Sequence, residues 1–261
     1  MIVPVTKALS LRGQLLENPL RYVKPPKVTK PEIHTYSLDE CLRLIRTSRE
    51  SKVVGEVRWD LMILLALYTG MRRGELLNLT WPEIDFEHRV IHIKPQKNSE
   101  YTWEWQAKDS ETRKLPLTEG LVRLLVKHQM KQPERCPYIF VPESRYRHIQ
   151  ELRQENKWKI KYGRCPLNNF TRQLTAIRRE AGIDKGTFHD LRRTCFKNLL
   201  ENGLGEYDHM NLAGHSTFET THRFYLSVSD SLLQRARVAT EQLHGCNPVA
   251  NLLQDPFEKK N

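Results

Sequence analysis

The sequence lacks an apolar run that could cross a bilayer, for which about 20 consecutive apolar residues are needed. Its first residues, MIVPVTKALSLRG, lack the apolar core and the cleavage site of a signal peptide. It also has no CxxC pair, and its five cysteines are scattered: Cys41, Cys136, Cys165, Cys195 and Cys246. These absences predict reduced thiols in a cytoplasmic protein, without structural zinc and without a membrane partner.

No internal repeat is visible, and 261 residues suit one large domain or a domain with a short appendage. Apolar residues make up 39% of the chain, which is enough to support a core and excludes a disordered protein. Lys and Arg total 42 against 31 Asp and Glu, a formal charge of +11. That excess predicts a polyanionic partner, most simply nucleic acid; a solvated basic surface is the alternative.

The first 31 residues have the pattern of a helix end followed by a linker. The helical pattern covers 7–17, and Pro25, Pro26 and Pro31 prevent a continuous helix after it. A chain that opens in this way is typical of a piece cut from something longer.

The rest of the chain predicts a mainly α fold with a small antiparallel sheet, an α+β class. Ser37 and Glu40 form a capping box, and the apolar run VRWDLMILLALYTG predicts a buried helix that ends at Gly70. A short helix follows in RRGELLNLTW. Strands are expected within 84–117, at Val90–Ile93, in YTWEWQA and in TRKLPL. Further helices are expected at about 118–130, 167–181, 188–202, 206–213 and 228–243.

Two further segments carry weaker patterns. Tyr138–Val141 is predicted to form one more short strand. The segment 143–164 is rich in cations and aromatics, which predicts either a contact with a nucleic-acid backbone or a solvated loop.

The stretch TFHDLRRTCFKNLLENG, at 187–203, begins a helix with unusual charges. His189 and Arg192 are three residues apart and share a neighbouring face of the first turn, where backbone N–H groups and the helix dipole favour an anion. A phosphate bound there would meet an imidazole, a guanidinium group and a helix end; a surface His and Arg is the alternative. Apolar residues recur beside them at helical spacing: Phe188, Leu191, Cys195 and Leu199.

Two more cationic residues stand in places that a fold can fix. Arg72 follows a glycine turn after the buried helix, and Glu75 is spaced to orient its guanidinium group, although a weak surface ion pair is the alternative. Lys108 lies in a polar turn between two expected strands, from which it could reach over a ligand. Most exposed lysines have no such role.

The order of these residues along the chain carries more information than any one of them. Arg72 stands in TGxR, Lys108 precedes a Pro-Leu pair by eight residues, Arg192 ends HxLR, and His215 follows it by 23 residues in a Gly-His pair. Tyr225 follows ten residues later; alone it would read as a packed aromatic. The ordered set resembles the catalytic domain of the tyrosine recombinases, also called phage-type integrases, over about residues 32–230.

The resemblance implies six catalytic residues: Arg72, Lys108, His189, Arg192, His215 and Tyr225. In the family, the tyrosine attacks the scissile DNA phosphate to give a 3′-phosphotyrosine, and the arginines clamp the non-bridging oxygens. Lys108 would protonate the leaving 5′-oxygen, His189 would handle the tyrosine proton, and His215 would donate to a phosphate oxygen. The resemblance further implies double-stranded DNA as partner, a tetramer assembled on DNA, and no metal, ATP or other cofactor.

The sequence departs from the family pattern in three places. The usual position of the nucleophile, nine residues after the histidine, holds Phe224, so either the loop has one extra residue or the site is impaired. Ala213 replaces the usual second Leu before Gly-His. Of the N-terminal core-binding domain that the family normally carries, we expect only a remnant here, because KALSLRGQLLENPL resembles its final helix. We therefore expect a remnant of that domain at 1–31, the catalytic domain at 32–230, and a C-terminal helix and tail at 231–261.

Two rival functions remain for the sequence. The pair His189–Asp190 resembles the dyad of a metal-dependent phosphohydrolase, with His209 and Asp208 as further ligands. The second rival is a catalytically impaired DNA-binding module of the same fold, suggested by the shifted Tyr225.

Overall fold

The computed structural model describes residues 33–51, 55–106, 112–133, 135–158 and 165–214. The chain divides into two units, Met1–Ile33 and His34–Asn261, and every element below belongs to the second. The helices are α2 (Leu38–Glu50), α3 (Trp59–Thr69), α4 (Arg73–Leu77), α5 (Glu119–Gln129), α6 (Glu143–Gln154), α7 (Phe170–Glu180), α8 (Phe188–Glu201) and α9 (Glu206–Ala213), with a 3-10 turn η2 (Trp81–Glu83). The strands are β1 (Ile84–Asp85), β2 (Val90–Ile93) and β3 (Arg113–Pro116).

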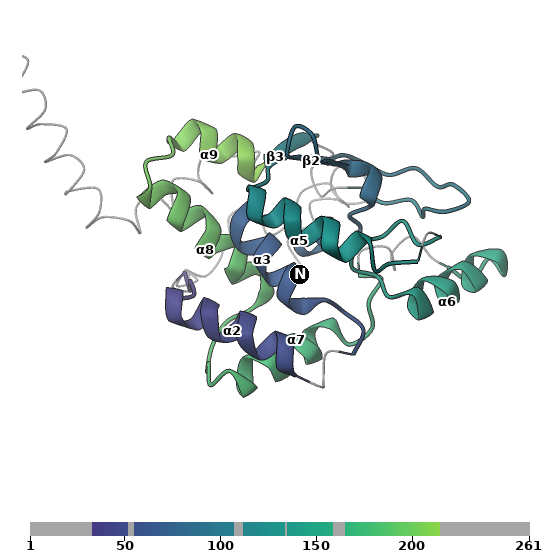
Figure 1. The fold of residues 1–261 in the computed structure, drawn as a ribbon, viewed down its shortest axis with the longest axis horizontal. Coiled ribbons are helices and arrows are strands. Elements are labelled where there is room, and N and C mark those ends of the chain that lie inside the picture. The colour runs from purple at the N-terminus through teal and green to yellow at the C-terminus, as the bar shows by residue number, and fades with distance from the viewer. Residues whose placement is uncertain (1–32, 52–54, 107–111, 134, 159–164, 215–261) are drawn as a thin grey trace, which may run out of the picture. The chain divides into compact units, whose positions relative to one another are not determined.

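Helix α3 is the central element of the core. Its sequence is apolar nearly all round, so it has no face suited to water, and α2, α5 and α8 pack against it (Figure 1). It ends at Gly70, which adopts a left-handed conformation with φ of 64°. Helix α2 begins at the predicted capping box of Ser37 and Glu40. The predictions of both helices, and of the short helix α4 after them, are confirmed.

The predicted antiparallel sheet is confirmed, with the strand order β1-β2-β3. Ile91 pairs with Leu115, and both side chains are buried in the core. The expected strand in YTWEWQA is wrong, because this segment pairs at a single position, where Trp105 faces Gln96. A strand requires a partner along its length, and here that requirement is met at one residue only.

A second, smaller apolar cluster covers the region between the sheet and α6. Trp103 stacks on Tyr138 with ring centroids 3.8 Å apart, and Tyr146 and Ile149 of α6 complete the cluster. The expected strand at Tyr138–Val141 is wrong, since this segment makes one isolated bridge, between Tyr138 and Thr80.

For 143–164, the solvated-loop alternative is wrong over residues 143–154, which form helix α6, whereas a contact with a nucleic-acid backbone stays a prediction. Arg153 donates to the backbone carbonyls of Ser99, Glu100 and Thr102, and Tyr146 donates to the carbonyl of Tyr101. These side chains therefore hold the 97–106 segment, and their contacts are internal to the protein.

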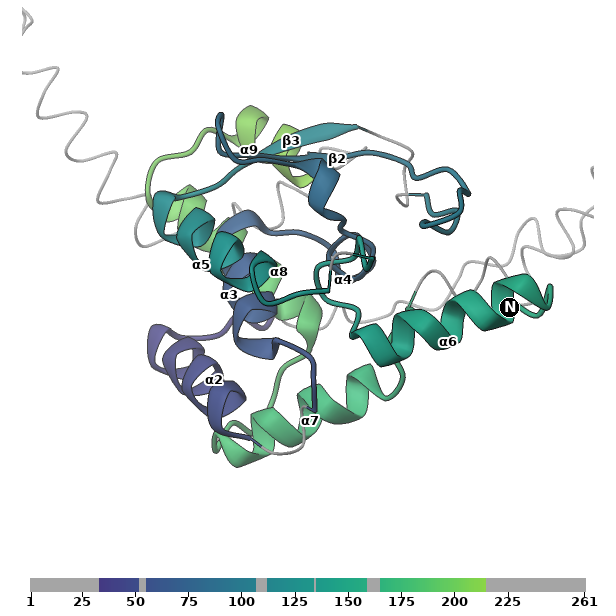
Figure 2. The ribbon, with the colours of Figure 1, turned by 45° about the vertical axis from the view of Figure 1, so that its right-hand side comes forward.

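Helices α7, α8 and α9 confirm the predictions for 167–181, 188–202 and 206–213. Helix α9 packs against α8 and lies beside β3, as both ribbon views show (Figures 1 and 2). The helix expected at 228–243 lies outside the described residues. Among the described helices, none is both long and apolar enough to cross a membrane.

Candidate functional site

The turn between α3 and α4 places Arg72. A side-chain Cβ on Gly70 would lie 2.6 Å from the ring of Phe196, so only glycine fits where the chain leaves α3. Arg72 is the residue before α4, and its backbone N–H donates to Glu75 Oε2 at 2.7 Å. The guanidinium Nη1 lies 3.1 Å from Glu75 Oε1. Glu75 therefore orients Arg72, as the sequence predicted, and it does so from a buried position rather than at the surface.

Helix α8 places Arg192 inside the protein. The helix begins at a capping box in which the backbone N–H of Thr187 donates to Asp190 at 2.7 Å. Arg192 is 3% exposed, lies over the ring of Phe196, and donates from Nη1 to the carbonyl of Gly70. Burial and the neighbouring cation Arg72 lower the pKa of Arg192 to about 9, so the guanidinium group is still charged at neutral pH.

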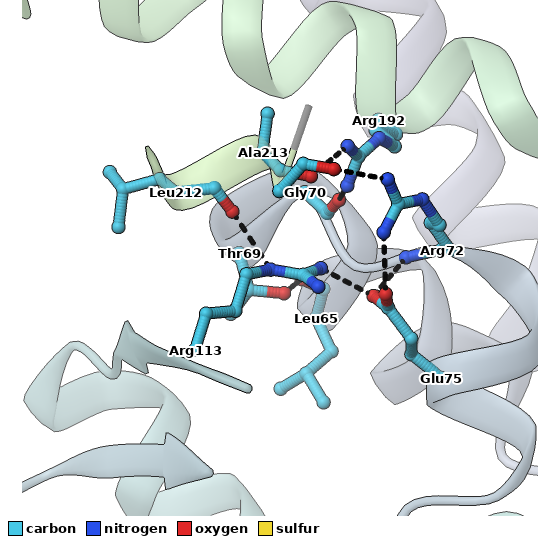
Figure 3. A network of polar contacts seen from close by, with 10 residues as sticks. Leu65, Thr69, Gly70, Arg72, Glu75, Arg113, Arg192, Leu212 and Ala213 are labelled. Carbon is cyan, nitrogen blue, oxygen red and sulfur yellow. Dashed lines mark hydrogen bonds and ion pairs between the residues drawn. The ribbon is translucent and has the colours of Figure 1, made fainter. Parts of the chain in front are cut away.

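The last turn of α9 brings the arginines together. Three successive backbone carbonyls end this helix, and each accepts a hydrogen bond from a different arginine (Figure 3): Leu212 from Arg113 Nε at 3.0 Å, Ala213 from Arg192 Nη2 at 2.5 Å, and Gly214 from Arg72 Nη2 at 2.5 Å. The carbonyls at a helix C-terminus have no partner within the helix and carry partial negative charge. They therefore attract cations, and they hold these guanidinium groups directly before residue 215.

His189 lies at the edge of the same site. It lines a pocket of about 560 Å³ together with Arg72, Arg73 and Thr187. Partial burial, with the cations Arg192 and Arg193 nearby, holds the pKa of His189 below its ordinary value. The imidazole is therefore neutral at pH 7 and able to accept a proton.

Arg113 is a site residue that the sequence reasoning missed. Its side chain is 7% exposed, and Nη2 lies 2.6 Å from Glu75 Oε2. Burial opposes the ionisation of Glu75, but Arg113 and the N–H of Arg72 outweigh it and hold the pKa of this carboxyl below its usual value. A signal was present in the sequence: in TRKLPL, the alternation of a strand places Arg113 on the same face as the buried Leu115.

The structure thus brings together three of the six predicted catalytic residues, Arg72, His189 and Arg192. The other three, Lys108, His215 and Tyr225, lie outside the described residues. Two of them are close in the sequence to described elements: β3 begins five residues after Lys108, and His215 follows the end of α9 by two residues.

The metal-site hypothesis finds no support in the part of the chain that is described. Asp190 uses its carboxylate to cap α8 and to pair with Arg193 at 2.6 Å. His209 is fully buried against the ring of Phe196. Within the described ranges, no three His, Cys, Asp or Glu residues lie close enough to hold a metal ion.

Comparison with known proteins gives the same assignment as the ordered motifs. The model of the phage integrase family matches residues 36–231, which is most of the chain. The chain belongs to the phage integrase family. This confirms the resemblance that the sequence predicted.

The chain is similar to tyrosine recombinases from several organisms. The chain is 27% identical to the tyrosine recombinase XerA of Pyrococcus furiosus, over 82% of this chain and 64% of that protein. It is also 27% identical to the tyrosine recombinase XerC-like protein of Caldanaerobacter subterraneus, over 83% of this chain and 57% of the relative. The chain therefore spans less than two thirds of the length of these two relatives.

Solved structures of a transposon integrase and of a recombinase share the fold. The Tn1549 transposon integrase, in complex with circular intermediate DNA, superposes with a TM-score of 0.64 at 19% identity, over 92% of this chain and 77% of that one. The crystal structure of XerA recombinase superposes with a TM-score of 0.55 at 22% identity, over 90% and 73%. At these identities the likeness establishes the mainly helical fold with its small antiparallel sheet.

Proposed function

We propose that this chain is the catalytic domain, at about residues 32–230, of a site-specific DNA recombinase that cuts and rejoins strands through a 3′-phosphotyrosine. One observation carries the proposal. Arg72 and Arg192 are 120 positions apart in the chain, yet both donate to adjacent carbonyls directly before His215. His189 lines the same pocket as Arg72.

The geometry suits phosphoryl transfer. Arg72 and Arg192 present planar guanidinium forks, which match the non-bridging oxygens of a phosphate better than ammonium groups do. Their orientation is held by a buried carboxylate and by backbone carbonyls. Donors fixed in this way stabilise the negative charge that grows in the transition state without having to reorganise.

In the proposed reaction, the phenol oxygen of Tyr225 bonds to the scissile phosphorus, and the bond from phosphorus to the 5′-oxygen breaks. His189 accepts the phenol proton, Lys108 gives a proton to the leaving 5′-oxygen, and His215 donates a hydrogen bond to a phosphate oxygen. The 5′-hydroxyl of a new strand then attacks the phosphorus and the bond to the Tyr225 oxygen breaks, which is possible without added energy because the first step exchanged one phosphate ester for another. The steps require neither metal nor ATP.

Double-stranded DNA is the proposed substrate, and self-assembly as a tetramer on DNA is the proposed working state. The excess of positive charge supports DNA binding. The Tn1549 integrase, whose fold this chain shares, was solved in complex with DNA.

The test is the formation of a covalent adduct. The protein is incubated with a nicked duplex that carries the DNA repeats flanking its gene, and the products are separated under denaturing conditions. We expect a protein–DNA adduct that is lost in Tyr225→Phe. The matched control is Tyr207→Phe, which changes an exposed tyrosine of α9 and should leave the adduct intact.

The alternative is an impaired DNA-binding module of the same fold, favoured by the position of Tyr225 one residue beyond the family spacing. It predicts DNA binding without any adduct from the wild-type chain. Recovery of an adduct in Phe224→Tyr would then assign the defect to the displaced tyrosine.

A further inference from the structure

Arg113 combines features that the proposed chemistry does not explain. It lies on β3, its side chain is 7% exposed, and it pairs with the buried Glu75 at 2.6 Å. Its Nη1 is buried without a hydrogen-bond partner among the residues that the structure describes. Removing an arginine from water is costly, so its retention inside the protein calls for a reason beyond packing.

The contacts of Arg113 join two elements that meet at the site. Through Nη2 it holds Glu75, whose carboxylate also accepts from the backbone and the side chain of Arg72. Through Nε it holds the carbonyl of Leu212 in the last turn of α9. Figure 3 shows the guanidinium group of Arg113 lying between these two partners.

Gly214 reinforces this connection. Its backbone is left-handed, with φ of 57°, and a Cβ there would lie 3.2 Å from Nη1 of Arg113. The backbone at the end of α9 therefore lies directly against the guanidinium group. Arg113 therefore fixes the backbone at Gly214, the residue that precedes His215 in the sequence.

We propose that Arg113 is a positioning residue, which locks Glu75 to the last turn of α9 and so keeps Arg72 and Arg192 placed for the phosphate. The inference rests on the proposed strand cleavage. Arg72 is bonded to two groups that Arg113 holds in place, the carboxylate of Glu75 and the carbonyl of Gly214 at the end of α9. Arg192 is bonded to one such group, the carbonyl of Ala213. Loss of Arg113 would therefore displace both guanidinium groups without removing either.

The test compares Arg113→Lys with the matched control Arg123→Lys. Arg123 forms an exposed ion pair with Glu119 on α5 and lies outside the site. A lysine at 113 keeps the charge but cannot donate to Glu75 and Leu212 in the geometry of a fork. We expect Arg113→Lys to slow single-turnover adduct formation at saturating DNA by about 10- to 100-fold, with DNA affinity changed much less. Arg123→Lys should match the wild type.

A second substrate separates positioning from general destabilisation. When a methyl group replaces one non-bridging oxygen of the scissile phosphate, the guanidinium groups have less charge to balance, and the deficit of Arg113→Lys should shrink. An equal deficit on both substrates would assign the effect to lost folded protein and overturn the inference.

A third measurement does not depend on turnover. The Nε–H NMR signals of Arg72 and Arg192, assigned with Arg72→Lys and Arg192→Lys, should shift or broaden in Arg113→Lys but not in Arg123→Lys. Unchanged signals in Arg113→Lys would overturn the inference, whether or not the wild-type chain forms an adduct. Failure of the wild-type chain to form an adduct would count against the proposed function instead. If the wild type forms an adduct and Arg113→Lys forms it at the same rate, the inference about Arg113 is overturned while the proposed function stands.

Discussion

Arg192 is a buried cation whose charge is stabilised by the groups around it. Its burial would be unfavourable for an unpartnered cation, but the carbonyls of Gly70 and Ala213 and the ring of Phe196 surround it with negative partial charge. Burial lowers its pKa only to about 9, and a bound phosphate would raise that pKa again. The charge is therefore held ready where a phosphate is proposed to bind.

We predict that Arg192→Lys lowers the rate of DNA cleavage by about 100- to 1000-fold, because an ammonium group cannot replace two donors fixed in one plane. Single-turnover adduct formation measures the loss. The control is Arg193→Lys, which changes the next residue of α8, a partly exposed partner of Asp190, and should have a small effect. Equal losses in the two variants would contradict the assigned role.

His209 predicts a pH dependence of stability. Burial, with Arg192 nearby, lowers its pKa to about 4, whereas the unfolded chain has the ordinary value of 6.5. Between these values the unfolded state binds more protons, so the free energy of unfolding falls as the pH is lowered through this window. Thermal melting from pH 7.5 to 4.5 measures the effect. His209→Gln, which does not titrate, should flatten the profile; an unchanged slope would assign the acid sensitivity to other groups.

At the scale of the elements, the site depends on how helices end. Helix α3 ends at Gly70, whose carbonyl accepts from Arg192, and α9 ends at carbonyls that accept from three arginines. Helix C-termini supply acceptors that the helix itself cannot satisfy. The same backbone groups therefore end the helices and orient the site.

We predict that Gly70→Ala destabilises the fold by about 2–4 kcal/mol, as the sum of a left-handed alanine and a forced shift of Phe196. DNA cleavage should fall as well, because the carbonyl that holds Arg192 moves with the turn. The control is Gly120→Ala in α5, where a Cβ meets open space; it should stabilise by up to about 1 kcal/mol. Chemical denaturation measures both, and a neutral Gly70→Ala would refute the close contact.

At the scale of the whole molecule, the charge of +11 acts beyond any single contact. Several surface cations are paired with carboxylates along their own helices, as Arg147 is with Glu143 and Arg43 with Asp39. Such exposed pairs contribute little to stability. The remaining excess favours a polyanion without defining its sequence.

We predict that DNA affinity falls linearly on a log–log plot against salt, with a slope of about 0.9 for each phosphate neutralised. Fluorescence anisotropy with a labelled duplex across a salt series measures the slope. A duplex of unrelated sequence and equal length serves as control and should also show a clear salt dependence. A flat plot would contradict a surface that contacts the phosphate backbone.

The local parts of this protein could be predicted from its sequence, because local sterics and hydrogen bonds determine them. The capping box at Ser37, the buried helix that ends at Gly70 and the spacing of Arg72 to Glu75 belong to this group. The strand expected in YTWEWQA failed because pairing depends on a neighbour that propensity alone does not reveal.

The convergence of the site was decided by the tertiary structure. Motif order suggested that Arg72 and Arg192 act together, but only packing of α8 and α9 against α3 and β3 brings both to the end of α9. Arg113 was missed for the same reason: a cation in a strand reads as exposed until a buried carboxylate from another element faces it. Sequence determines what each segment can form, whereas contacts between distant segments depend on how all of them pack at once.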